Sequence, residues 1–407
     1  MDRVILHCDC NNFFASCECA VNPELWKVPI AVAGDPESRH GIICAKNQLA
    51  KEAGVKTAEP IWQAMRKCPN LVCVPAHFDL YHEFYEKINA IYLDYTDLVE
   101  PFSIDESYLD LTGCMHLFSG KTPKDIADEI RGRVQLELGI TISVGVSFCK
   151  CFAKLGSDYK KPNATTVIME EDVPRIVYPL PVTDLLFVGK KSADILHAHA
   201  VYTIEDLSHL SKEYLSKILG CQGEQLYTYV NCLDTEPVRS FYEKIPPKSV
   251  GNSMTFRRDI SGEKEVRAGV SALADSVAFR LRAEKLKCTT IQITIRDPSF
   301  SQVQRQRKLS HPTYLQKEIT DVAMQLIAAN WDFKNPIRLL GVTGADLVDE
   351  SAEVATQLSL FESNLAEDKV DTKKQEAIED TMASLREKFG SDVIKLGYSE
   401  NEELGIK

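Results

Sequence analysis

Two adjacent carboxylates, Asp105 and Glu106, stand inside an otherwise apolar stretch, residues 100–111, which predicts two short strands joined by a tight bend. Neighbouring negative charges in a half-buried hairpin repel each other and resist desolvation, so they need a compensating charge. A bound divalent cation would supply it. The pair alone does not establish such a site, because a solvated hairpin turn has the same pattern and 59 acidic residues in 407 produce several such pairs by chance.

A third carboxylate, Asp9, lies near the end of an apolar run, residues 4–10, which predicts a buried strand. Mg²⁺ prefers octahedral oxygen ligation and is usually held by one or two carboxylates together with substrate phosphates. Asp9, Asp105 and Glu106 on neighbouring strands would suit two such ions, which could clamp an in-line phosphoryl displacement. The structural alternative is a strand-end aspartate that only accepts a capping hydrogen bond.

Three segments resemble the signature motifs of Y-family translesion DNA polymerases, closest to the bacterial DinB and UmuC branches. They are residues 9–18 (DCNNFFASCE), 103–106 (SIDE) and 160–163 (KKPN), in that family's order and spacing. The resemblance runs from Met1 to about Asp349. It implies a template-directed DNA polymerase of low fidelity, a nucleotidyltransferase that extends a primer 3′-hydroxyl and copies past damaged bases.

The resemblance also implies roles for the carboxylates and for the steric gate. Asp9, Asp105 and Glu106 correspond to the catalytic residues that hold two Mg²⁺ ions, and the main-chain carbonyl of Cys10 completes one coordination sphere. Phe14 corresponds to the steric gate, an aromatic ring that collides with a ribose 2′-hydroxyl. Without the resemblance, Phe14 would be interpreted as a core aromatic residue at a strand-to-helix turn.

Two lysines correspond to the cations that meet the incoming triphosphate. Lys161 matches the lysine of the Lys-Pro-Asn motif, and Lys51 stands where the fingers present an arginine or, in UmuC-like members, a lysine. Many DinB-type members place a tyrosine three residues before that cation, whereas this chain has Gln48. Lysine supplies a point charge and arginine a bidentate fork, so the triphosphate affinity should differ. Ordinary surface lysines are the alternative.

A multidomain α+β fold is expected, with the right-hand architecture of palm, fingers, thumb and little-finger domains. At 407 residues the chain is too long for one hydrophobic core. Strand-like and helical runs interleave over the first 165 residues. The expected domains are the palm at 1–12 and 78–166, the fingers at 13–77, the thumb at 167–238, a linker at 239–247, the little finger at 248–349 and a tail at 350–407.

Basic charge is concentrated in one segment, although the net charge of −12 argues against nucleic-acid binding when taken alone. Residues 246–349 contain 16 Lys and Arg against 11 Asp and Glu, which fits a local phosphate-binding surface. Period-two alternation places Arg305 and Arg307 on one face of a strand. With primer-template DNA as the partner, the predicted phosphate contacts here are Arg296, Arg305, Arg307 and Lys308, a solvated strand face being the alternative.

The predicted thumb contains a possible second DNA contact. Residues 186–193 resemble the first turn of a helix-hairpin-helix, in which backbone N–H groups and Lys190 and Lys191 would hold a phosphate. Phe187 replaces the usual first glycine, which weakens the match. A plain helix-loop-helix without close DNA contact is the alternative.

The acidic C-terminal tail contains an apolar pentapeptide, Gln357-Leu358-Ser359-Leu360-Phe361. Exposed Leu and Phe in a loosely structured tail are unfavourable unless a pocket receives them. The pentapeptide resembles the motif by which bacterial polymerases bind the sliding clamp (beta clamp), with Leu360 and Phe361 as anchors. Docking of this segment on its own protein is the alternative. Farther on, residues 378–389 predict a helix whose apolar face packs intramolecularly.

Composition restricts the remaining functions. Thirteen cysteines cannot all pair, and their Cys-x-Cys spacing differs from that of zinc sites, so reduced core thiols are expected. The chain shows neither a membrane span nor a secretion signal, so a cytoplasmic protein is expected. Nothing in the sequence suggests an obligate dimer, so a monomer is expected. Two rival functions are a non-catalytic DNA-bound accessory protein of a damage-tolerance complex, which would not need the carboxylates, and a two-metal nuclease, which would not need Phe14 or the triphosphate lysines.

Overall fold

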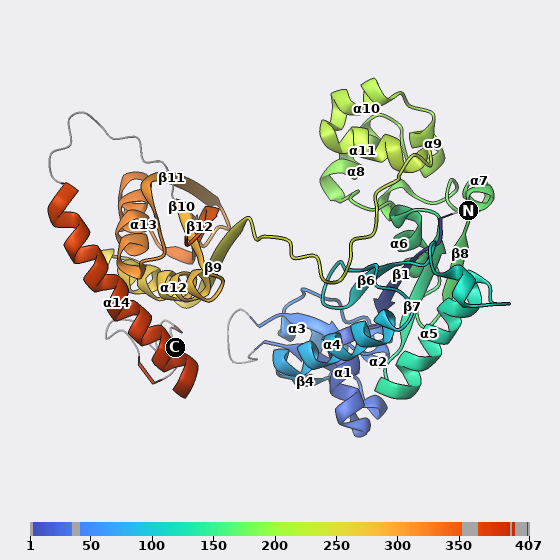
Figure 1. Ribbon diagram of the computed structural model, residues 1–407, viewed down its shortest axis with the longest axis horizontal. Coiled ribbons are helices and arrows are strands. Elements are labelled where there is room, and N and C mark those ends of the chain that lie inside the picture. Colours follow the sequence, from blue (N-terminus) through green and yellow to red (C-terminus); the bar gives the residue numbers. More distant parts are fainter. Residues whose placement is uncertain (1–2, 35–40, 352–364, 391–392, 395–404, 406–407) are drawn as a thin grey trace. The chain divides into compact units, whose positions relative to one another are not determined.

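The structure is a computed structural model, which describes residues 3–34, 41–351, 365–390, 393–394 and 405. The described chain forms a mixed α+β fold that divides into two compact units, residues 1–244 and 245–407 (Figure 1). Each unit has its own hydrophobic core. None of the helices in the described ranges has the length and apolar character of a membrane span.

The first unit is built around a five-stranded sheet with the order β5-β6-β1-β7-β8. The central strand β1 is buried along its whole length, because helices cover both faces of the sheet. Its even-numbered residues face the core beneath α4 and α5, and its odd-numbered residues face α6. The elements are β1 (Ile5–Cys10), β5 (Val99–Pro101), β6 (Glu106–Asp110), β7 (Ile142–Ser147), β8 (Thr165–Ile168), α4 (Phe78–Leu93), the short η2 (Met115–Leu117), α5 (Pro123–Leu138) and α6 (Lys150–Tyr159).

A second, smaller sheet follows the first helix of the chain. Its order is β3-β2-β4, and it has a core of its own made of small aliphatic residues. Asn47 begins α2 by accepting a hydrogen bond from the Ala50 N–H, which is a typical N-cap. The elements are α1 (Phe13–Val21), η1 (Pro23–Lys27), β2 (Ile30–Ala33), β3 (Ile43–Lys46), α2 (Gln48–Glu52), α3 (Ile61–Lys67) and β4 (Val72–Val74).

A group of short helices completes the first unit and shares a core with α6. Helices α10 and α11 approach so closely that a Cβ at Gly223 would lie 2.0 Å from the Leu215 carbonyl oxygen, so only glycine fits there. The elements are η3 (Glu170–Asp172), α7 (Val173–Ile176), η4 (Val182–Asp184), α8 (Lys190–Ala198), α9 (Ile204–Ser208), α10 (Lys212–Leu219) and α11 (Cys221–Val230).

The segment after α11 lies against the large sheet before the chain leaves the first unit. Val238 is buried beside Ile5 and Tyr108. The Arg239 guanidinium lies 2.8 Å from Glu100, a buried carboxylate that also pairs with Lys150 at 2.7 Å. Burial by itself would raise the pKa of Glu100, but these two cations lower it. The start of the expected linker is therefore held on the sheet by ionic and apolar contacts.

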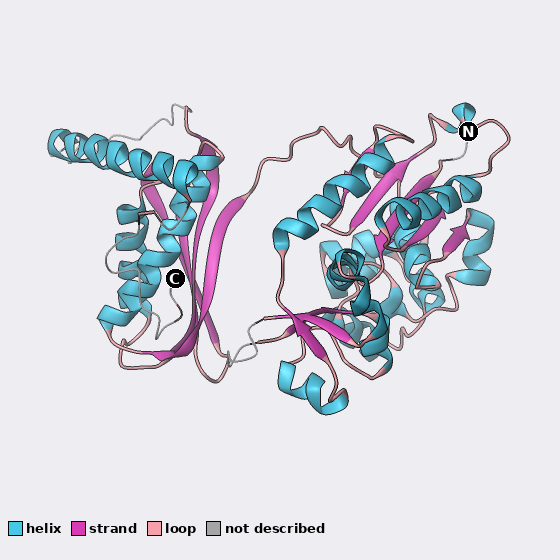
Figure 2. Ribbon diagram, turned by 90° about the horizontal axis from the view of Figure 1, so that it is seen from below, coloured by secondary structure: helices cyan, strands magenta, loops and turns pink. Residues whose placement is uncertain are grey.

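The second unit is a four-stranded antiparallel sheet with the order β11-β10-β12-β9, and α12 and α13 cover one of its faces (Figure 2). Alternating isoleucines of β10 point toward these helices and are fully buried. The elements are β9 (Ser249–Ile260), α12 (Glu263–Ala283), β10 (Leu286–Arg296), β11 (Gln302–Thr313), α13 (Gln316–Asn330) and β12 (Ile337–Asp349).

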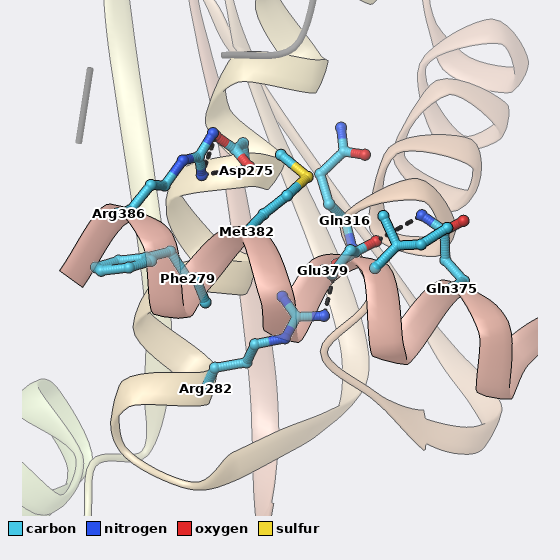
Figure 3. A pocket seen from close by; sticks show the side chains of 10 residues that line it. Asp275, Phe279, Arg282, Gln316, Gln375, Glu379, Met382 and Arg386 are labelled. Atoms are coloured by element: carbon cyan, nitrogen blue, oxygen red, sulfur yellow. Dashed lines mark hydrogen bonds and ion pairs between the residues drawn. The ribbon is translucent and has the colours of Figure 1, made fainter. Parts of the chain in front are cut away.

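The C-terminal helix α14 (Leu365–Phe389) packs against α12 and the start of α13, and Figure 3 shows the pocket between α12 and α14. Glu379 pairs with Arg282 and accepts a hydrogen bond from the Gln316 N–H, 3.1 Å away. It thereby satisfies a backbone donor at the beginning of α13, which has no side-chain cap of its own. Two turns farther on, Arg386 lies 2.9 Å from Asp275. The helix packs intramolecularly as predicted, but largely through these ion pairs, since Ile378 and Phe389 of the predicted apolar face are 46% and 69% exposed.

Candidate active site

Asp9 and Glu106 are brought together by strand pairing. They are directly opposite each other in the antiparallel register of β1 and β6, and opposite residues project from the same face of a sheet. That face is covered by α6, and the Asp9 side chain is only 6% exposed. Two carboxylates are therefore held side by side in a partly dehydrated position, as the sequence predicted from the strand pattern.

Asp105 lies at the bend just before β6. Its carbonyl oxygen accepts a hydrogen bond of 2.9 Å from the Cys10 N–H, which fixes the bend against the end of β1. Its side chain accepts a hydrogen bond from the Ser103 hydroxyl at 2.6 Å. Burial raises the pKa of Asp105, and the charges of Asp9 and Glu106 raise it further. The bend therefore has a local excess of negative charge.

Two lysines partly compensate that charge. Lys154 on α6 lies 3.0 Å from Asp9 and 3.2 Å from Glu106, and Lys161 lies 2.7 Å from Asp9. Both ammonium groups also contact Asp158, at 3.1 Å and 2.8 Å respectively. Burial opposes the charged form of Lys154, but its three carboxylate neighbours raise its pKa, so it is a permanent cation.

His7 is a buried neighbour of Glu106. It is completely buried, its Nδ1 lies 2.8 Å from the Ser157 hydroxyl, and its Nε2 lies 3.3 Å from Glu106 Oε2. Burial lowers the pKa of His7 and keeps the imidazole neutral. Burial would raise the pKa of Glu106, but the contacts with His7 and Lys154 hold it well below its ordinary range. The Glu106 carboxylate is therefore ionised at neutral pH.

The chemistry of this group fits a hard divalent cation. Asp9, Asp105 and Glu106 offer only oxygen ligands, and the buried Glu106 Oε2 meets Lys154 at 3.2 Å and His7 at 3.3 Å. Within the described ranges, no three His, Cys, Asp or Glu side chains are already arranged around one ion position. Asp9 and Glu106 face ammonium groups and Asp105 faces Ser103, so metal binding requires these contacts to be exchanged.

Phe14 is held by aromatic stacking at the start of α1. Its ring is stacked on Tyr81 with centroids 4.3 Å apart and an interplanar angle of 14°. The Tyr81 hydroxyl donates a hydrogen bond of 2.6 Å to Glu18, a buried carboxylate on the same helix as Phe14. Phe78, which is 63% exposed, meets the Phe14 ring edge-on. The ring therefore has a fixed orientation in an aromatic group that is partly open to solvent.

The two predicted triphosphate lysines lie in different settings. Lys161 is in the acidic group described above. Lys51 is exposed in α2, beside Lys46, whose pKa is lowered by partial burial and by the charge of Lys51. Gln48 donates a hydrogen bond to Glu52 within the same helix. Contacts within the structure therefore link Lys161, but not Lys51, directly to Asp9.

The residues predicted to contact DNA in β10 and β11 divide between two faces of the sheet. Arg305 and Arg307 pair with the buried Ile293 and Ile291, and therefore share the face covered by helices. Each reaches an amide on α13, Arg307 at 2.6 Å and Arg305 at 3.0 Å. Arg296 and Lys308 belong to the opposite, open face. All four remain at least partly accessible.

A bend at Phe187 precedes α8, in the segment where the helix-hairpin-helix turn was predicted. Phe187 adopts φ +68°, a left-handed conformation that is uncommon for a bulky residue. The Gln222 amide donates a hydrogen bond to its carbonyl, and Lys190 and Lys191 are exposed at the first turn of the helix. The clamp-motif residues Gln357, Leu358, Leu360 and Phe361 lie outside the described residues.

The sequence interpretation did not identify His7, Asn11, Tyr81 or Lys154 as parts of this site. For Lys154 a signal was present, because Lys154 and Asp158 are four residues apart on a helix that leads to Lys161. The others depend on which side chains meet across the sheet, which sequence spacing does not reveal.

The fold resembles that of a solved Y-family DNA polymerase chimera, with a TM-score of 0.75 at 23% identity, covering 85% of this chain and 99% of the other. The model of the impB/mucB/samB family matches residues 8–158, and that of the family's C-terminal domain matches residues 247–360. DNA polymerase IV of Acetivibrio thermocellus is 44% identical over 98% of this chain and 97% of its own. DNA polymerase IV 1 of Bacillus subtilis is 38% identical over 98% and 94%.

The fold and the carboxylate site thus define a right-hand polymerase architecture, as predicted. The chain belongs to the impB/mucB/samB family of Y-family translesion DNA polymerases.

Proposed function

We propose that Asp9, Asp105 and Glu106 bind the two Mg²⁺ ions with which this DNA-directed DNA polymerase extends a primer on damaged template. Metal-dependent nucleotidyl transfer is general to the family. The observation that carries the residue assignment is the direct pairing of Asp9 with Glu106 across β1 and β6, beside Asp105 at the bend. The main-chain carbonyl of Cys10 would add a further oxygen ligand.

The ions, when bound, would lower the pKa of the primer hydroxyl and neutralise the leaving pyrophosphate. Asp9 and Glu106 would present their carboxylate oxygens to the ions in a fixed orientation, because both residues lie on paired strands. Lys161 and Lys51 would bind the triphosphate of the incoming deoxynucleotide. Lys161 is suited to this because it already lies between Asp9 and Asp158 and could move its charge to a phosphate without leaving the site.

Phe14 would select the sugar. Its stacking on Tyr81 prevents the ring from rotating away from a ribose 2′-hydroxyl. Selection by a fixed ring is an example of specificity through a built-in clash with the wrong substrate.

The predicted domain boundaries are supported by the way the elements group. The sheet β5-β6-β1-β7-β8 falls in residues 1–12 and 78–168, close to the proposed palm, and β2–β4 fall in the proposed fingers, 13–77. Helices α7–α11 fall in the proposed thumb, 167–238, and β9–β12 in the proposed little finger, 248–349. The linker at 239–247 contains the boundary between the two compact units.

We also propose a sliding clamp as partner, bound through Gln357, Leu358, Leu360 and Phe361, and a monomeric polymerase. The clamp proposal rests on the motif and on its place between β12 and α14. The left-handed backbone at Phe187, just before α8, supports a phosphate contact by Lys190 and Lys191 in a helix-hairpin-helix turn.

Primer extension tests the proposed function directly. Wild-type protein with Mg²⁺, a primer-template and deoxynucleotides is compared with the variant Asp105→Asn/Glu106→Gln. We expect extension by the wild type and none by the variant. Shortening of the strand would instead indicate a nuclease, and inactivity of both proteins would indicate a non-catalytic accessory role.

Charge reversal tests the DNA contacts in β10 and β11 face by face. We expect Arg305→Glu/Arg307→Glu and Arg296→Glu/Lys308→Glu each to weaken DNA binding equally for all sequences. Each pair should reduce the slope of log K against log salt by about 2, because each phosphate contact contributes about 1. Binding isotherms at several salt concentrations measure this, with Arg267→Glu on α12 as the control. Unchanged binding for either pair would exclude that face.

A further inference from the structure

We propose that Asn11 is a positioning residue for nucleotide binding, because it ties the strand that carries Asp9 to the loop that carries Lys161. The inference rests on the proposed role of Lys161 toward the triphosphate. Asn11 directly follows β1, two residues after Asp9, and its partner Asn163 stands two residues after Lys161. One side chain therefore links the metal-ligand strand to the lysine loop.

The Asn11 amide makes three hydrogen bonds. Its Oδ1 accepts a hydrogen bond of 2.8 Å from the Asn163 N–H and another of 3.1 Å from the Thr141 hydroxyl. Its Nδ2 donates a hydrogen bond of 2.9 Å to the Ser143 hydroxyl on β7. The residue is only 6% exposed, so water cannot easily replace these partners. The amide therefore joins β1, β7 and the loop, which are distant in the sequence.

The opposite side of the loop is held by Arg131 on α5. Its guanidinium donates to the main-chain carbonyl of Asn163 and, at 2.9 Å, to Asn163 Oδ1. Arg131 is itself fixed by Asp128, 2.7 Å away. Asn163 adopts φ +50°, and its N–H, carbonyl and side-chain oxygen all have partners. Asn11 and Arg131 thus hold the same loop residue from two directions.

This arrangement has a consequence for Lys161. Its ammonium group lies 2.7 Å from Asp9 and 2.8 Å from Asp158, although a lysine side chain has many rotamers. The position of that charge therefore depends on the position of the loop backbone. A displaced backbone would place the cation away from the triphosphate, and small misplacements of binding groups have large kinetic effects.

The test compares two substitutions of Asn11 in the full chain. Asn11→Leu has a similar size but no hydrogen-bonding atoms, and Asn11→Asp keeps the acceptor that binds the Asn163 N–H. We expect Asn11→Leu to raise the KM for deoxynucleotides by at least about tenfold, with a smaller change in kcat. Asn11→Asp should restore the KM to within about threefold of the wild type.

Equilibrium binding of a deoxynucleotide to the protein on a dideoxy-terminated primer should weaken in parallel, and primer-template affinity should not change. Asn231→Leu, in a partly buried asparagine after α11, is the matched control and should leave the KM unchanged. Arg131→Lys perturbs the same loop residue from its other side. Lysine keeps the positive charge next to Asp128 but cannot make the two hydrogen bonds of the guanidinium to Asn163, so this variant should also raise the KM.

Lys161→Ala separates this inference from the proposed function. If Lys161→Ala leaves the KM unchanged, the triphosphate role of Lys161 is wrong and the inference falls with it. If Lys161→Ala raises the KM but folded Asn11→Leu and Arg131→Lys do not, only the positioning role is wrong. A parallel rise in the KM for all three, with rescue by Asn11→Asp, supports the proposal.

Discussion

Replacement of Asp9 by asparagine is expected to abolish primer extension, with kcat lowered on the order of 10³-fold or more. A metal ion at this position contributes several kcal/mol to the stabilisation of transition-state charge, and each 1.36 kcal/mol corresponds to a factor of about ten in rate. Asn keeps the shape of the side chain but removes the charge that would hold the ion. Primer-template affinity should change little, because no proposed DNA contact involves Asp9.

The variant should still fold. Asp9 is the common neighbour of Lys154 and Lys161, but neither lysine would be left unpaired without it. Lys154 keeps Glu106 and Asp158, and Lys161 keeps Asp158. Loss of activity can therefore be separated from loss of structure, which would occur if a buried charge lost its only partner.

Single-turnover extension and thermal unfolding together measure the effect. Asp110→Asn is a matched control, because Asp110 lies on β6 opposite Ile5, far along the strand from the bend, and asparagine can still accept the hydrogen bond from the Thr112 N–H. Extension by Asp9→Asn within tenfold of the wild-type rate would contradict the metal-ligand assignment.

The strands of the site could be predicted from the sequence because their signal is local. An apolar run ending at two polar residues predicted β1, and the structure places it at Ile5–Cys10. The apolar stretch 100–111 predicted two short strands and the bend before β6. The position of Lys154 could not be derived in this way, because it depends on how α6 crosses the face of the sheet that carries Asp9.

The period-two sequence pattern of β11 also predicted only part of what the structure shows. Period two correctly placed Arg305 and Arg307 on one face, but it does not reveal which face a helix covers. The structure shows that their face is the one packed with α13, and that Arg296 and Lys308 are on the other. At Phe187 the missing glycine weakened the match to a helix-hairpin-helix, yet the aromatic residue adopts the left-handed conformation. Packing of the short helices and the Gln222 hydrogen bond outweigh the local preference there.

Replacement of Phe14 by alanine is expected to raise incorporation of ribonucleotides relative to deoxynucleotides by on the order of 10- to 200-fold, the range that a single methylene-sized difference in fit produces. In the wild type the ring cannot move away from a 2′-hydroxyl, because it is stacked on Tyr81, which is hydrogen-bonded to Glu18. Alanine would leave space for the 2′-hydroxyl where the ring stands in the wild type. Removal of a half-buried ring should also lower stability by about 1–3 kcal/mol, which thermal unfolding would detect.

The measurement is the ratio of kcat/KM for a ribonucleotide to that for the matching deoxynucleotide. Phe14→Tyr is the control, because it keeps the ring and should keep the discrimination. Tyr81→Leu removes the stacking partner without removing the gate, so it should relax discrimination to a smaller extent than Phe14→Ala. If Phe14→Ala discriminates as strongly as the wild type, Phe14 is a packing residue of the aromatic group and some other contact selects the sugar.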